Sequence, residues 1–244
     1  MTELVRFAAF AASQALSAIT PRPQRSHISE ICAALLGYNT LAALQVEDAD
    51  ASFEFHLDDA EIIVLDPVRG RVRAFALLTD ASDPQVNTIV DACIAGINGA
   101  ADPTPVYVGL VNFWEDFARD AMADAITSSD EVANGMADSN ASFSDDAELP
   151  EEVPAADDLW AARYQWSLTA QGAVTGDADT GRPYTGHVLN CQSKLTFIKA
   201  GRAGLMSMEA EAFGGIDDTW REQDRQDEED FWREMELRDR GTSS

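Results

Sequence analysis

Lysine is almost missing from this chain of 244 residues, and histidine and cysteine are also scarce. Only Lys194 and Lys199 stand beside fifteen arginines, with three histidines and three cysteines. So few histidines exclude most histidine-rich metal sites. The cysteines are far apart, without C-x-x-C spacing, and their odd number argues against a disulfide framework. We therefore predict reduced thiols and a cytoplasmic protein.

Familiar catalytic and cofactor signatures are missing as well. The sequence has no G-x-S-x-G motif, no P-loop, no H-E-x-x-H and no dinucleotide-binding glycine fingerprint. It has no strongly apolar run of about 18 residues, the length needed to cross a membrane. Near the amino terminus Glu3 cancels the charge of Arg6, which is atypical of a secretion signal. These absences predict a non-enzymatic protein that needs no cofactor or metal and does not bind membranes.

Acidic residues dominate what is present. Forty-three aspartates and glutamates against seventeen basic residues give a formal net charge of −26 and a pI near 4.1. Such a field repels nucleic acid and anionic membranes and attracts basic surfaces. Two interpretations stay open at this point. The acidity is either adaptation to a salty cytoplasm or a means of recognising a basic partner.

The acidity is concentrated in residues 127–158, which hold ten carboxylates and no lysine or arginine. Neither a helical nor a strand period runs through them, so we predict an acidic linker or loop. Its paired carboxylates are candidate partner-binding residues: Asp145, Asp146, Glu151, Glu152, Asp157 and Asp158.

The predicted fold class is α+β. We expect N-terminal helices, a mixed or antiparallel sheet with two packed helices, and a C-terminal long β-hairpin followed by a charged terminal helix. The corresponding segments are a helical segment at 1–47, a sheet domain at 51–126, the acidic linker at 127–158, and the hairpin with its helix at 159–244. Within the sheet domain we predict strands near 53–57, 62–65, 72–78 and 105–111, and helices near 84–99 and 112–126.

The N-terminal segment reads as helix, glycine turn at Gly37, and helix, which is the order of a DNA-binding helix-turn-helix. Residues 40–45, in the recognition position, contain no lysine or arginine and run directly into Glu47 and Asp48. Phosphate contacts supply most of the affinity for DNA. We therefore predict a helical pair used for packing or protein contact, and no direct nucleic-acid binding.

In the C-terminal segment, apolar and polar side chains alternate over 160–168 and again over 189–197, which predicts a hairpin with its tip at 172–186. A charged helix is expected from about 217 to 240. Its aromatic residues lie among charges, as binding anchors often do. We predict that Phe231, Trp232 and Met235 contact a partner or a second copy of the chain. Packing of this helix on its own domain is the alternative.

One enzymatic alternative rests on His56 and Asp58, with Asp59 and Asp66 nearby. On a strand, His56 and Asp58 would share one face and could hold a divalent ion for a hydrolase or nuclease. Solvated acids at a strand end are the other interpretation of the same residues.

The favoured hypothesis is an acidic binding or inhibitory protein that engages a basic, nucleic-acid-binding protein or complex. Counter-defence factors of phages and mobile elements, including anti-CRISPR inhibitors, have a similar charge profile, although no sequence motif links them to this chain. The alternatives are the metal-dependent hydrolase and a salt-adapted structural or regulatory module.

Overall fold

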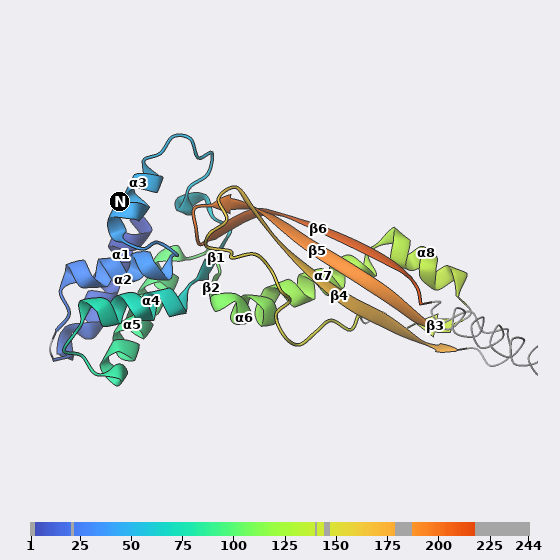
Figure 1. Ribbon diagram of the computed structural model, residues 1–244, viewed down its shortest axis with the longest axis horizontal. Coiled ribbons are helices and arrows are strands. Elements are labelled where there is room, and N and C mark those ends of the chain that lie inside the picture. The colour runs from blue at the N-terminus through green and yellow to red at the C-terminus, as the bar shows by residue number, and fades with distance from the viewer. Residues whose placement is uncertain (1–2, 21, 140, 144–146, 179–186, 218–244) are drawn as a thin grey trace, which may run out of the picture. The chain divides into compact units, whose positions relative to one another are not determined.

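The structure is a computed structural model that describes residues 3–217, apart from 21, 140, 144–146 and 179–186 (Figure 1). It confirms the predicted α+β class. Six strands join in one mixed sheet in the order β2-β1-β6-β5-β4-β3. None of the helices in this described part has the length and apolar character needed to cross a bilayer.

Two compact units can be distinguished. Unit 1 comprises the chain up to Met122 together with Pro150–Thr169 and Lys194–Ala210. Unit 2 comprises Ala123–Leu149, Ala170–Ser193 and the chain from Glu211. The boundary at Leu149 assigns the two ends of the acidic residues 127–158 to different units.

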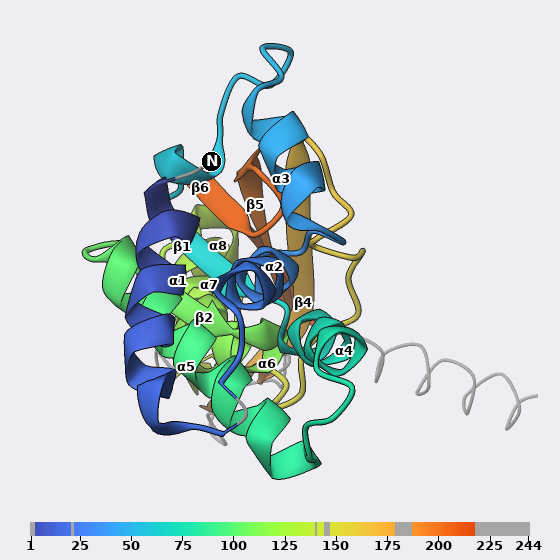
Figure 2. The same ribbon diagram turned by 90° about the vertical axis from the view of Figure 1, so that its left-hand side faces the viewer.

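Helices form most of unit 1 (Figure 2). The first and fifth helices approach each other closely. Small residues make this possible: a Cβ added to Gly96 on the fifth helix would lie 2.5 Å from the carbonyl oxygen of Ala8 on the first. The elements are α1 (Glu3–Ala15), continued by the 3-10 turn η1 (Leu16–Ala18), then α2 (Arg25–Leu35), α3 (Leu41–Asp48), α4 (Pro67–Leu77) and α5 (Asp83–Ala101).

Strand β1 (Ile62–Leu65) is buried along its whole length. It pairs in parallel with β2 (Val106–Val108) and antiparallel with β6 (Gly204–Ile216). The predicted hairpin is β4 (Gln165–Ala178) with β5 (Val188–Ala200). Its first strand begins five residues later than predicted and continues through 172–178, which were expected in the tip. The two strands are antiparallel. The backbone amide of Lys199 donates to the carbonyl of Tyr164 at one end, and the backbone amide of Gly176 donates to the carbonyl of His187 at the other.

Aromatic side chains fill the part of unit 1 where the sheet meets the next helical run. That run consists of α6 (Gly109–Phe113), the π-helical turn η3 (Trp114–Ala118) and α7 (Arg119–Thr127). The ring of the buried Phe113 lies 5.5–6.1 Å from four neighbouring rings, those of Tyr107, Phe117, Trp166 and Phe197.

Unit 2 has a smaller apolar core beneath α8 (Asp130–Asp138). Ser129 caps this helix: its hydroxyl accepts from the amide of Val132 and donates to the carbonyl of Ala212. Val132 then packs with Val174, Leu189 and Cys191. The short strand β3 (Ala141–Phe143) pairs antiparallel with β4.

Two predicted strands are wrong. Residues 53–57 are irregular and lead into the 3-10 turn η2 (Leu57–Asp59). The predicted strand at 72–78 falls mostly in α4, because Asp66 is a helix cap and not part of a hairpin turn. Its carboxylate accepts from the amide of Arg69 at 2.8 Å, and Pro67 occupies the first turn.

Other corrections follow from local chemistry. The predicted strand 105–111 ends at Val108, where Gly109 turns the chain with φ +84° into α6. Residues 127–158 are not loop throughout, since they contain α8 and β3, although 149–158 are irregular as predicted. Strand β6 was not predicted, and the predicted C-terminal helix lies outside the described residues apart from its first position, Asp217.

Candidate functional site

Residues 150–158 form an irregular segment of unit 1, here called the acidic strap. Two buried indoles hold its backbone. Trp114 donates from Nε1 to the carbonyl of Glu151 at 3.2 Å, and Trp166 donates from Nε1 to the carbonyl of Asp157 at 2.8 Å. Buried Trp N–H groups seek a partner. Here they fix both ends of the strap to the core.

The end of the strap is fixed further by the residues that follow it. Leu159 is fully buried, and Trp160 donates from Nε1 to the carbonyl of Val64 in β1 at 2.8 Å. The carboxylate of Asp158 accepts from the backbone amide of Trp160 at 2.9 Å. The charged end of the strap therefore has a defined conformation.

Four of the predicted partner-binding carboxylates belong to this segment. Glu151, Glu152, Asp157 and Asp158 are all exposed. The remaining predicted residues, Asp145, Asp146, Phe231, Trp232 and Met235, lie outside the described residues.

A cavity of about 500 Å³ opens beside the end of the strap and is here called the arginine cavity. Three separate stretches of the chain form it, from α3 and the segment after it, from the residues that follow the strap, and from the turn between β5 and β6. Its lining residues are Glu47, Phe53, Trp160, Ala161, Ala162, Arg163, Gly201 and Arg202.

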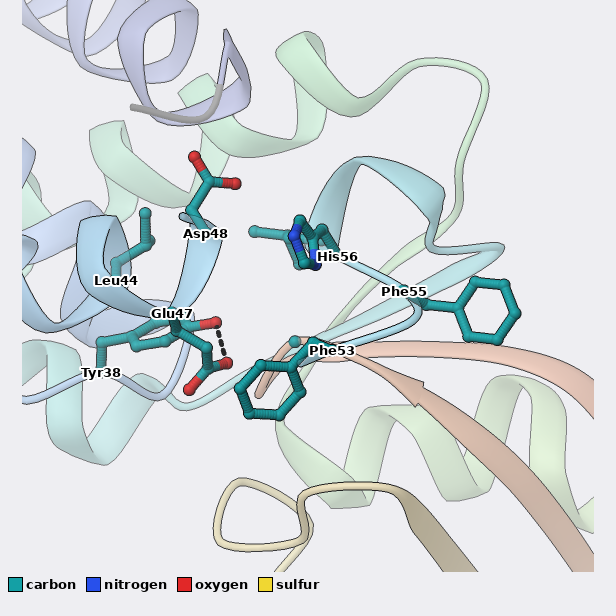
Figure 3. Close-up of a pocket in the computed structure, with 9 residues that line it drawn as sticks. Tyr38, Leu44, Glu47, Asp48, Phe53, Phe55 and His56 are labelled. Atoms are coloured by element: carbon teal, nitrogen blue, oxygen red, sulfur yellow. Dashed lines mark hydrogen bonds between the residues drawn. The ribbon is translucent and has the colours of Figure 1, made fainter. Parts of the chain in front are cut away.

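A hydrogen-bond network lies at one wall of the arginine cavity. The Tyr38 hydroxyl donates to Oε1 of Glu47 at 2.7 Å (Figure 3) and accepts from the Arg202 amide at 3.3 Å. Burial, followed by the hydrogen bond to Glu47 and then its charge, raises the pKa of Tyr38. Gly201 has φ +68°, and an added Cβ would lie 2.9 Å from the Tyr38 hydroxyl, so this turn requires glycine.

Behind this wall lies a buried lysine. Lys199 is 3% exposed, and its Nζ donates to the carbonyl of Arg202 at 2.7 Å. Burial lowers the pKa of Lys199 from its ordinary 10.5 to about 7, although the charges of Glu47 and Asp158 act in the opposite direction. Near neutral pH this amine therefore exists in both protonation states.

The predicted His56 and Asp58 metal site loses its geometric basis. These residues do not share a strand face, because His56 precedes the turn η2 and its amide donates to Asp59 at 2.8 Å. Asp66 is used elsewhere, as the cap of α4. In the part of the chain that the structure describes, no three His, Cys, Asp or Glu side chains are arranged to hold a metal ion.

His56 lines a small cavity of about 10 Å³ beside α3, which has room for about one water molecule. Figure 3 shows its ring across from Asp48, with Phe53 next to Glu47 and Phe55 turned away. Burial and the charge of Asp48 raise the pKa of the nearby Asp58.

Sequence reasoning missed Tyr38, Glu47, Lys199 and Arg202. One signal was available. The buried side chains of β5 fall on alternate residues from Leu189 to Phe197, and Lys199 continues that face. A lysine at the end of a buried face needs a local acceptor.

Comparisons of this chain with protein families, with curated proteins and with solved structures find no match. Its function is therefore inferred from the geometry and charge of the site.

Proposed function

We propose that this protein binds a basic partner protein through the acidic strap and catalyses no reaction. The partner is a nucleic-acid-binding protein or complex whose cationic surface meets the exposed carboxylates Glu151, Glu152, Asp157 and Asp158. The observation that carries the proposal is the fixing of the strap backbone by Trp114 and Trp166. A charged segment that is already ordered loses less conformational entropy on binding.

Salt adaptation alone accounts less well for this arrangement. General solubility needs dispersed charge and sets no requirement on backbone order. In the strap, buried indole N–H groups instead donate to two backbone carbonyl groups, and the four carboxylate side chains are exposed. We place the protein in the cytoplasm, which the free thiols of Cys32, Cys93 and Cys191 support.

The first prediction is that neutralising the strap abolishes capture of the partner. The variant carries Glu151→Gln, Glu152→Gln, Asp157→Asn and Asp158→Asn, and each new amide retains an oxygen that can accept. The matched control carries Glu54→Gln, Asp91→Asn, Glu115→Gln and Asp120→Asn, which are also exposed and remove the same four charges.

Each form is immobilised and exposed to an extract of the native host, and retained proteins are identified by mass spectrometry. We expect the wild type and the control to retain one protein of pI above about 9, the range of nucleic-acid-binding domains, and the strap variant to lose it. Retention by the strap variant, or a retained partner of acidic pI, contradicts the proposal.

A second prediction concerns strap order. Trp166→Phe removes the donor to the Asp157 carbonyl and leaves the charge of the strap unchanged. A hydrogen bond of this kind contributes about 1 kcal/mol, so affinity for the captured partner should fall about fivefold, measured by calorimetry. Amide exchange at Asp158 and Leu159 should quicken in parallel. Faster exchange with unchanged affinity would show that strap order does not matter for binding.

A further inference from the structure

A second binding site follows from the arginine cavity, and its ligand is a small molecule. We propose that this cavity binds an anion that carries a planar ring. Its volume of about 500 Å³ falls within the range of roughly 300–1,000 Å³ that is usual for small-molecule sites. Cations are rare in this chain, yet two of its seventeen basic residues, Arg163 and Arg202, line this one cavity.

Arg163 has hydrogen-bonding capacity to spare. Within the described residues it forms no salt bridge, and its guanidinium lies over the rings of Phe53 at 5.1 Å and Tyr164 at 5.9 Å. It also interacts electrostatically with Asp50, whose pKa is lowered by hydrogen bonds with Ser52 and, less, by the charge of Arg163. A guanidinium carries five N–H donors in a planar fork that matches carboxylate and phosphate groups. The aromatic contacts orient this fork without using its donors.

Arg202 is also incompletely satisfied. Its Nε lies 3.5 Å from Oε2 of Glu47 and its Nη1 lies 3.4 Å from the carbonyl of Gly37, both longer than the usual 2.7–3.2 Å. Glu47 has a shorter bond to Tyr38, at 2.7 Å. The Arg202 side chain is 36% exposed. An incoming anion would therefore meet donors that the protein has not fully paired.

The aromatic residues that line the cavity indicate that its ligand also carries a planar ring. The ring of Phe53 lies next to Glu47 (Figure 3), but it already stacks on Tyr164 at 6.1 Å and lies under the Arg163 guanidinium. The indole of Trp160, held in place by its bond to the Val64 carbonyl, is therefore the aromatic surface that a ligand ring would meet. Both residues line the cavity, together with the small residues Ala161, Ala162 and Gly201. Fixed aromatic faces favour stacking with a planar ring. The same anionic chemistry occurs in nucleoside monophosphates and in aromatic carboxylates.

The test uses adenosine monophosphate and indole-3-acetate as probes, with adenosine as the uncharged control. Binding to the full chain is measured by calorimetry at low ionic strength and by the NMR shift of the Trp160 indole N–H. We expect one of the two anions to bind saturably and to shift this resonance, while adenosine binds at least tenfold more weakly. The anion that binds identifies the source as phosphate or carboxylate.

Matched variants assign the binding to the cavity. Arg163→Gln should weaken it at least tenfold, because it removes the charged fork. Phe53→Leu should weaken it as well, because it removes a ring that orients this fork. Arg71→Gln removes the same charge from an exposed arginine of α4 and should leave affinity unchanged. Thermal unfolding confirms that each variant is folded. The proposal is overturned if neither anion binds saturably, or if Arg163→Gln and Arg71→Gln behave alike.

Discussion

Replacing Gly96 by alanine should destabilise unit 1 by about 2–3 kcal/mol, the cost of overpacking a tight contact. Gly99→Ala, three residues further along α5, should instead stabilise it by about 0.5–1 kcal/mol. An added Cβ at Gly96 would lie 2.5 Å from the Ala8 carbonyl oxygen and 3.2 Å from its carbon, whereas at Gly99 it meets nothing within 4 Å. The obstacle is backbone of α1, which cannot rotate away as a side chain can.

Thermal unfolding distinguishes the two glycine variants. At about 2–4 °C per kcal/mol for a chain of this size, Gly96→Ala should lower the midpoint by about 4–12 °C. Gly99→Ala should raise it slightly, which makes it a control for the general effect of alanine on this helix. A rise of both midpoints would show that helix propensity, and not the α1–α5 contact, determines the result.

The second large effect is expected at Lys199. Because the pKa of Lys199 is lowered from 10.5 to about 7, the unfolded chain holds a proton between these values that the folded chain releases. Folding stability due to this group therefore rises with pH across this window, and the full cost is present below about pH 7. Lys199→Met removes the cost but also the hydrogen bond to the Arg202 carbonyl. We expect a net gain of about 2 kcal/mol at pH 7.

Urea unfolding at several pH values from 6 to 10 tests the account of Lys199. The advantage of Lys199→Met over the wild type should shrink by about 1 kcal/mol per pH unit above pH 7 and disappear near pH 9. Lys194→Met, on the same strand at a half-buried position, removes the same charge and is the matched control. Equal pH profiles for the two variants would exclude burial of Lys199 as the cause.

How much of the fold the sequence predicts depends on periodicity. The helix over residues 84–99 and the strand over 189–197 were predicted, because apolar side chains repeat at the helical or strand period and the structure buries those faces. Helix α4 was mistaken for a strand because its apolar residues happen to alternate while only Gly70 and Ala74, four apart, are buried. Strand β6 was missed because three glycines and two glutamates interrupt any apolar pattern.

The acidic strap could be predicted from the sequence, whereas the arginine cavity could not. Charge alone indicated the carboxylates of the strap, since they are contiguous in sequence. The indole bonds that hold the strap involve Trp114, far upstream, and no spacing rule connects it to Glu151. The arginine cavity combines residues near 47, 160 and 202, which only the folded chain brings together.

The central claim is that the carboxylates of the strap recognise a basic partner, and the salt dependence of affinity tests it most directly. Calorimetric titration with the captured partner is made from about 0.05 to 0.5 M salt, over which the screening length falls well below 10 Å. We predict that the wild-type affinity falls steeply across this range. The strap variant should bind weakly at every concentration and depend little on salt. Wild-type affinity that is flat in salt, or equal slopes for wild type and strap variant, would contradict the claim.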